Sequence, residues 1–204
     1  MAASPWQHVP MPPRISELPR NTAGRPVPGN VPWYGTDAGD GQMRVARSAE
    51  LGPYVACPCT PGQGAPAFGD QCPEHQRSLM AGRRCGTCTA PIEPNRRLVF
   101  VGAAEASYFL EPPVHPACAV YALQVCPVLS RDSSKVSVSV ARSFTMTERR
   151  ITGLGHDFRP KYTVFPLGSA LAKEAGALDM YVAFPKEAEQ MLASDWLAQQ
   201  PSIA

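Results

Sequence analysis

The sequence predicts an α+β protein, and three observations point to this class. First, 23 prolines and 16 glycines among 204 residues leave little room for long helices. Second, short β-type runs such as residues 98–101 recur between turn residues, and only brief stretches have helical periodicity. Third, metal-type side chains come in two closely spaced pairs on either side of that run, Cys85-x-x-Cys88 and His115-x-x-Cys118.

The first part of the chain, residues 1–35, is rich in proline and is expected to form an extended arm. Its prolines remove backbone donors and fix φ, which argues against both a helix and a central strand. Disorder is the alternative for the first dozen residues. From Arg14 onward, apolar residues recur that can lie on a neighbouring part of the protein: Ile15, Leu18, Val27, Val31, Trp33 and Tyr34.

Residues 36–130 are predicted to form the core that carries the paired ligands. One or two short strands are expected between 43 and 56, then a Cys/Gly/Pro loop over 57–75 and one or two helical turns from residue 76. Residues 98–101 and 107–110, separated by a turn at Gly102, predict a β-hairpin.

A helix is predicted directly after His115. Proline is favoured at the first helical position, which Pro116 would occupy, and apolar residues continue to Val125. The helix should end at Cys126, because the residue before a proline disfavours helical geometry. Cys126 lies too far along the helix to share a metal with Cys118, so we expect a buried apolar thiol there.

Residues 131–204 are predicted to form a small sheet with a C-terminal helix. Residues 135–141 alternate valine with serine or lysine, which is typical of a half-buried strand. Residues 142–151 would extend this strand or pair with it, and two more short strands are expected at 162–166 and 180–185. Apolar residues at helical spacing predict the helix over 186–199.

The paired side chains Cys85, Cys88, His115 and Cys118 predict one metal site. A C-x-x-C turn lets two thiolates reach one ion, and ligands three residues apart on a helix share a face. Three thiolates and an imidazole form a tetrahedral zinc set, and such closed coordination favours a structural ion over a catalytic one. Knuckle, hairpin and helix in this order predict a treble-clef-like core. An iron–sulfur cluster is the less favoured alternative.

A second cluster, Cys57, Cys59, Cys72 and His75, offers the same donor types and predicts a second zinc site. Its signal is weaker, because two cysteines separated by one residue chelate less well than a C-x-x-C. The two clusters either close separately, which we favour, or alternate between two ions in a cross-braced way. The alternatives without a metal are reduced thiols in a loop, or a redox pair at Cys57 and Cys59.

Charge and compartment limit the function classes. A net charge of +2 argues against a protein that mainly coats nucleic acid. The basic residues Arg83, Arg84, Arg96 and Arg97 still allow local nucleic-acid binding, although solvated surface is the commoner explanation. No apolar run is long enough to span a bilayer, and the N-terminus lacks a secretory pattern. We therefore expect a cytoplasmic protein with no membrane partner, whose cysteines stay reduced.

Several short segments together carry a resemblance. They are Pro13-Arg14-Ile15, Leu18-Pro19, Arg25-Pro26-Val27-Pro28, Glu111-Pro-Pro-Val-His115-Pro-Ala-Cys118-Ala and Cys126-Pro-Val-Leu. This pattern resembles an uncharacterised family of small zinc-binding proteins from actinobacteria and tailed phages. The likeness covers residues 84–129, is looser over the arm and is faint after residue 130, and the cluster at 57–75 has no counterpart in the family. The resemblance implies zinc binding and a bacterial or phage origin, and it implies no activity.

These features predict a small soluble zinc-binding protein with a structural metal, acting as a binding or adaptor protein for a protein partner. A nucleic-acid-binding regulator is the alternative. A third hypothesis, an enzyme with a redox or open metal site near Cys57 and Cys59, is less favoured. The sequence predicts no catalytic residue and no oligomeric state.

Overall fold

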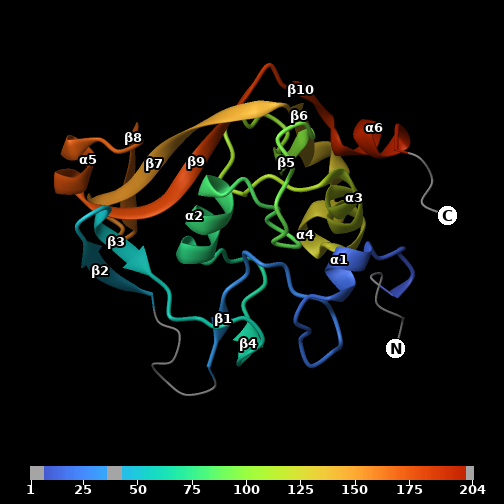
Figure 1. Ribbon diagram of the computed structural model, residues 1–204, viewed down its shortest axis with the longest axis horizontal. Helices are drawn as coiled ribbons and strands as arrows, with labels where there is room; N and C mark the ends of the chain where they lie inside the picture. Colours follow the sequence, from blue (N-terminus) through green and yellow to red (C-terminus); the bar gives the residue numbers. More distant parts are fainter. Residues whose placement is uncertain (1–6, 36–42, 201–204) are drawn as a thin grey trace.

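The α+β class is confirmed by the computed structural model, which describes residues 7–35 and 43–200 (Figure 1). Two larger sheets and a two-stranded ribbon are accompanied by short helices. The choice between an extended arm and disorder for the first dozen residues falls partly on residues 1–6, which lie outside the described ranges.

The largest sheet has five strands in the order β2-β3-β9-β7-β8. They are β2 (Arg44–Ser48), β3 (Gly52–Ala56), β7 (Ser143–Leu154), β8 (Pro160–Pro166) and β9 (Ala177–Lys186). β3 and β9 are parallel, and the other neighbours are antiparallel. The strands expected within 43–56, at 162–166 and at 180–185 are therefore present, and the stretch 142–151 forms most of β7.

The second sheet has three antiparallel strands in the order β10-β6-β5. They are β5 (Leu98–Ala103), β6 (Val136–Ala141) and β10 (Glu189–Leu192). A separate ribbon joins β1 (Trp33–Tyr34) of the arm to β4 (Ala65–Pro66) of the cysteine-rich loop. Both larger sheets thus combine strands from the two sides of residue 130, where the sequence suggested a division between units.

The predicted hairpin of 98–101 with 107–110 is wrong. β5 pairs along its length with β6, and Phe109 makes an isolated bridge to Ala183 of β9. The cause is burial, because the Phe109 ring packs in the core with its centroid 5.3 Å from that of Phe100. β5 does meet the chain again at Val114, through one bridge from Val99, immediately before His115.

The helix predicted over 186–199 is only half present. Its first part is β10, which pairs with β6, and α6 (Ala193–Ala198) follows. Met191 on β10 and Trp196 on α6 pack into one apolar cluster, so apolar spacing alone could not separate strand from helix here.

β6 is buried at all six positions rather than half-buried as predicted. One serine of its alternating pattern, Ser137, forms hydrogen bonds inside the protein. The Ser137 hydroxyl donates to the Ala103 carbonyl at 2.8 Å and accepts from Gln190 at 3.0 Å. The polar residue Ser137 in the alternating pattern therefore lies in the interior and not on the surface. A hydroxyl can be buried when it is hydrogen-bonded.

Helix α2 (Pro73–Ala81) lies beside β9 of the five-stranded sheet (Figure 1). Buried polar side chains fix it there. Arg77 donates to the carbonyls of Asp179 at 2.6 Å and Val55 at 2.9 Å, which joins the parallel strands β9 and β3. Gln76 donates to the carbonyls of Leu110 at 2.7 Å and Tyr181 at 2.8 Å. These bonds hold the middle of α2 against β3, β9 and Leu110.

Helix α3 (Pro116–Val125) begins and ends as predicted, and α4 (Pro127–Ser130) follows the break at Cys126. Residues Ala119, Val120 and Leu123 of α3 pack against the valines of β6. The remaining helix, α5 (Ala170–Ala175), lies between β8 and β9 in the chain, beside the five-stranded sheet (Figure 1).

The described part of the arm, residues 7–35, packs on the core. One helical turn, α1 (Pro13–Ser16), interrupts it, contrary to the expectation that proline excludes a helix. Pro13 occupies the first helical position, where a missing N–H costs no helical hydrogen bond. Ile15 is 1% exposed and belongs to the same apolar cluster as Cys85, Cys88 and Cys118. The arm is therefore part of the surroundings of the candidate ligands.

Candidate metal centres

Side chains from two distant parts of the chain meet in a group that we call the four-ligand centre: Cys85, Cys88, His115 and Cys118. Their ligand atoms all lie within 4.8 Å of one another. The three cysteines are buried and the histidine is half-buried. Sulfur atoms on a tetrahedral zinc ion lie about 3.8 Å apart, given zinc–sulfur bonds of about 2.3 Å. One ion can therefore contact all four atoms after small movements.

The first two ligands lie on a tight turn, the knuckle, formed by residues 85–90. The Cys88 N–H points at Cys85 Sγ (3.4 Å), and the Thr89 N–H donates to the Cys85 carbonyl (2.9 Å). The Cys85 N–H closes the turn on the Ala90 carbonyl (2.9 Å). Thr89 adopts φ 61°, a left-handed conformation that is unfavourable for a β-branched residue. The knuckle thus holds its two sulfurs together at a cost in backbone strain.

The histidine is presented by the start of α3, where His115 is the N-cap residue. Its Nδ1 lies 3.4 Å from Cys88 Sγ, and its Nε2 lies 3.2 Å from the Pro91 carbonyl and 3.1 Å from Arg14 Nη1. Arg14 can only donate, so its bond requires an unprotonated Nε2, whereas the Pro91 carbonyl requires a protonated one. A cation on Nδ1 would keep the proton on Nε2 and select the Pro91 bond, as is usual for a metal-bound histidine.

The protonation of the four-ligand centre favours a bound cation. Side-chain hydrogen bonds with Cys118 and Cys85 lower the pKa of Cys88, so its thiolate forms first. Hydrogen bonds with Cys85 and Cys88 raise the pKa of Cys118, and those same two partners raise the pKa of His115 to about 10. Cys118 and His115 therefore stay protonated at neutral pH beside the Cys88 thiolate, because further negative charge this close is unfavourable. A divalent cation would take the place of those protons.

A second set, the three-thiol group, consists of Cys57, Cys59 and Cys72, whose sulfurs lie within 4.8 Å of one another. Cys72 is the N-cap residue of α2, and its Sγ lies 3.5 Å from Cys59 Sγ. Glu74 Oε2 accepts the Cys57 N–H at 3.0 Å. Burial raises the pKa of Cys57 and of Cys72, which opposes the low-pKa thiolate that a redox pair requires. The sulfurs of Cys57, Cys59 and Cys72 therefore meet one another and none of the four-ligand centre, so the ligands of the two clusters do not alternate between two sites.

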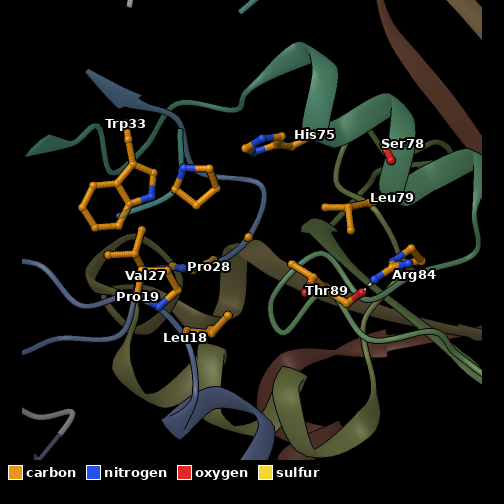
Figure 2. Close-up of a pocket in the computed structure, with 12 residues that line it drawn as sticks. Leu18, Pro19, Val27, Pro28, Trp33, His75, Ser78, Leu79, Arg84 and Thr89 are labelled. Atoms are coloured by element: carbon orange, nitrogen blue, oxygen red, sulfur yellow. Dashed lines mark hydrogen bonds between the residues drawn. The ribbon is translucent and has the colours of Figure 1, made fainter. Parts of the chain in front are cut away.

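His75, predicted as the fourth ligand of the second cluster, does not converge with its cysteines. Its ring lines a cavity of about 300 Å³, together with Trp33, Leu79 and Thr89 (Figure 2). Burial lowers the pKa of His75, so the ring is neutral near pH 7, and no described residue pairs with its buried Nδ1. The three-thiol group therefore supplies three ligands where the sequence suggested four.

One residue that the sequence did not single out, Asn30 of the arm, contacts both groups. Its carbonyl accepts the Cys72 N–H at 2.8 Å, and its own N–H donates to the Gly86 carbonyl of the knuckle at 3.2 Å. The adjacent Gly29 N–H donates to the Thr87 carbonyl at 2.9 Å. Backbone hydrogen bonds between distant segments leave no local pattern, and only the turn-prone Pro28-Gly29-Asn30 run marks this position in the sequence.

Three of the four arginines considered for nucleic-acid contact are engaged with the protein. Arg83 donates to the carbonyls of Pro94, Arg96 and Arg142. Arg84 donates to the Thr89 carbonyl at 2.7 Å, which supports the knuckle, and Arg97 lies 3.3 Å from Glu189. Arg96 is exposed. Most of this positive charge therefore has a structural explanation.

Comparisons with protein-family models, curated proteins and solved structures find no match for this chain. The resemblance to a family of actinobacteria and tailed phages therefore stays a prediction. Within residues 7–35 and 43–200, no helix combines the length and apolar character needed to cross a membrane.

Proposed function

We propose that this protein binds zinc and that the four-ligand centre holds one structural ion. The observation that carries the proposal is the convergence of three sulfurs and one imidazole nitrogen within 4.8 Å, from a turn and a helix start that are separate in the sequence. Thiolates with one imidazole in a tetrahedral arrangement favour zinc over harder cations such as magnesium or calcium.

The surroundings of the four-ligand centre support a treble-clef-like arrangement. A knuckle, strand β5 and helix α3 follow one another in that order. In place of the expected hairpin of 98–101 with 107–110, one bridge joins Val99 of β5 to Val114, just before α3. The positive end of the α3 dipole lies beside the thiolates, which adds to their stability. The ion would join the knuckle to α3, and Ile15, which packs in the same apolar cluster as the three cysteines, would join the arm to both.

A structural role fits this centre better than a hydrolytic one. Four protein ligands leave no coordination position for water, and the three sulfurs lie in the core. The three-thiol group is the candidate for a second zinc ion, whose fourth ligand would come from outside the three cysteines.

Exposed apolar side chains support a role as a binding or adaptor protein. They gather on and beside the β7–β8 hairpin at an edge of the five-stranded sheet: Leu154, Phe158, Tyr162, Val164, Leu167 and Leu171. Phe158, at the turn, is 84% exposed. Apolar patches at an unpaired sheet edge are typical of protein-binding surfaces. A protein partner thus has more support than nucleic acid.

Metal analysis of the purified protein tests the proposal. We expect at least one zinc ion per chain. Cys88→Ser and His115→Ala should lose that ion and unfold the central segment, because the free energy of metal binding is free energy of folding. Cys126→Ser is the matched control, since this thiol belongs to neither group. Metal-free protein, or either variant with unchanged stability, would contradict a structural ion.

The adaptor role is tested separately on the β7–β8 hairpin. Leu154→Ser combined with Phe158→Ser should abolish capture of the protein's cellular partner and leave the zinc content unchanged. Capture that survives this change, or that depends instead on the exposed Arg96, would move the binding surface away from the hairpin.

A further inference from the structure

A second, larger cavity lies beside the knuckle, although none of the seven candidate ligand side chains lines it. It has a volume of about 530 Å³ and is lined by the arm, the loop at residues 68–70, Gly86 and Thr87 of the knuckle, and the helices α3 and α4. Most of its wall is apolar, with contributions from Ile15, Val31, Phe68, Val125 and Leu129. Its volume is within the range of small-molecule sites, about 300–1,000 Å³.

One carboxyl group on this wall lacks a cationic partner. Glu111 Oε2 accepts a hydrogen bond of 2.6 Å from Asn30 Nδ2, and Glu111 takes part in none of the ion pairs among the described residues. The side chain is accessible from the cavity, yet enough protein surrounds the carboxyl that desolvation raises its pKa to about 7. A carboxylate in this position would be stabilised by a cation inside the cavity.

A second polar group on the wall is also unsatisfied. Tyr121 of α3 lines the cavity and is 5% exposed, and its buried hydroxyl has no hydrogen-bond partner among the described residues. A buried hydroxyl without a partner is unfavourable.

The other charged side chains on the wall do not neutralise Glu111. Arg25 donates to the Val125 carbonyl at 3.0 Å, and its guanidinium lies 4.9 Å from the centre of the Phe68 ring. Asp70 is a second acid on the same wall. With two carboxyl groups and one engaged arginine, the cavity favours a positively charged ligand over an anion.

We propose that this cavity binds a small organic amine, with the protonated nitrogen at Glu111 and an aromatic or aliphatic body along the apolar wall. The apolar wall would shield the body from water, and the carboxyl would select the charge. None of the seven metal-type side chains of the two groups lines the cavity, but Gly86 and Thr87 of the knuckle do, so the site is tested on metal-loaded protein.

Calorimetric titration of the full-length, metal-loaded protein with tryptamine and with its neutral analogue tryptophol tests the proposal. Tryptamine should bind at least about tenfold more tightly than tryptophol, because a charge-assisted hydrogen bond is worth about 1.5–3 kcal/mol. Glu111→Gln, which keeps the side-chain size, should remove this preference and leave the zinc content unchanged. Equal affinities for the two compounds, or a preference that survives in the variant, would overturn the proposal.

A measurement on the unaltered protein covers the case in which the variant folds poorly. Cys126 lines the same cavity and belongs to neither cysteine group. Peptide mass spectrometry can follow the alkylation of Cys126 by N-ethylmaleimide. Tryptamine should slow this reaction more than the same concentration of tryptophol does. Unchanged alkylation at saturating tryptamine, or no saturable binding at millimolar concentrations, would also overturn the proposal.

Discussion

The two cysteine groups use similar residues and spacing but offer different numbers of ligands. Each combines a pair of nearby cysteines with a residue at a helix N-cap, which is His115 in α3 and Cys72 in α2. In the four-ligand centre, the side chain three residues further on, Cys118, joins the group. In the three-thiol group the corresponding side chain, His75, lines a neighbouring cavity instead.

The different numbers of ligands follow from the hydrogen bonds that the two N-cap side chains, Cys72 and His115, form. Cys72 Sγ accepts the backbone N–H of His75 at 3.5 Å, so its sulfur lies over the first turn of α2. His115 makes no such capping bond, and its Nδ1 faces the sulfurs while Nε2 reaches the Pro91 carbonyl. Helical spacing therefore places two side chains on one face, and their rotamers decide whether they meet at one point.

The largest expected effect separates the two groups by their contribution to folding. Cys118→Ser should lose the structural ion and lower the free energy of unfolding by roughly 5 kcal/mol or more, since structural zinc sites bind with about 10–16 kcal/mol. Cys59→Ser should cost less than about 2 kcal/mol, because its group provides only three ligands. Urea denaturation with metal analysis measures both values. Equal losses, or a larger loss for Cys59→Ser, would remove the distinction.

A second prediction tests the packing of the arm on the knuckle. A Cβ at Gly29 would overlap Cγ2 of Thr89. Gly29→Ala should therefore destabilise the protein by about 1–3 kcal/mol, and adding Thr89→Ser, which removes that methyl group, should restore most of the loss. Denaturation of the two single variants and the double variant checks this. If the effects simply add, the arm does not lie on the knuckle as described.

Short-range patterns predicted the elements that local chemistry determines. Helix α3 begins at Pro116 and ends before Pro127, because proline fixes both limits. The same holds for the two ligand pairs, whose members are close in sequence. By contrast, the partner of β5, the strand at 189–192 and the burial of β6 depend on contacts between distant segments. No local pattern contains that information.

For the candidate site too, short-range features could be predicted from the sequence and long-range ones could not. The meeting of Cys85, Cys88, His115 and Cys118 could be predicted from spacing, whereas the orientation of His75 depends on a rotamer and the role of Asn30 on backbone hydrogen bonds. Cys126, expected to be buried, is partly exposed and lines the larger cavity.

A smaller effect should reveal coupling between the two groups. Since Asn30 bonds to both Cys72 and the knuckle, metal at one group should favour the arrangement of the other. We expect Cys59→Ser to weaken zinc binding at the four-ligand centre by about fivefold, measured by competition with a chelator. Cys126→Ser is the control and should bind as the wild type does. Identical affinities in all three proteins would show that the groups are independent.

The smallest predicted effect concerns pH and lies at Glu111, away from both groups. Burial raises the pKa of this carboxyl from 4.5 to about 7, so between these values the folded protein binds more protons than the unfolded chain. Stability from this group is therefore highest at low pH and falls as pH rises towards 7. The variant Glu111→Gln has no carboxyl at this position and so lacks this pH dependence.

Comparison of the wild type with Glu111→Gln isolates that contribution. From about pH 6 to about pH 8, the wild type should lose at most roughly 1 kcal/mol relative to the variant, after discounting for solvent that reaches the carboxyl. The other titratable groups on this cavity, Arg25, Asp70, Tyr121 and Cys126, are present in both proteins. A relative gain by the wild type over this range would contradict the assigned direction.

X-ray absorption at the zinc edge, on a Cys57→Ser, Cys59→Ser, Cys72→Ser variant, examines the four-ligand centre alone. The account predicts one zinc ion per chain with three sulfur neighbours at about 2.3 Å and one nitrogen at about 2.0 Å. Protein without zinc, or zinc surrounded mainly by oxygen, would contradict it.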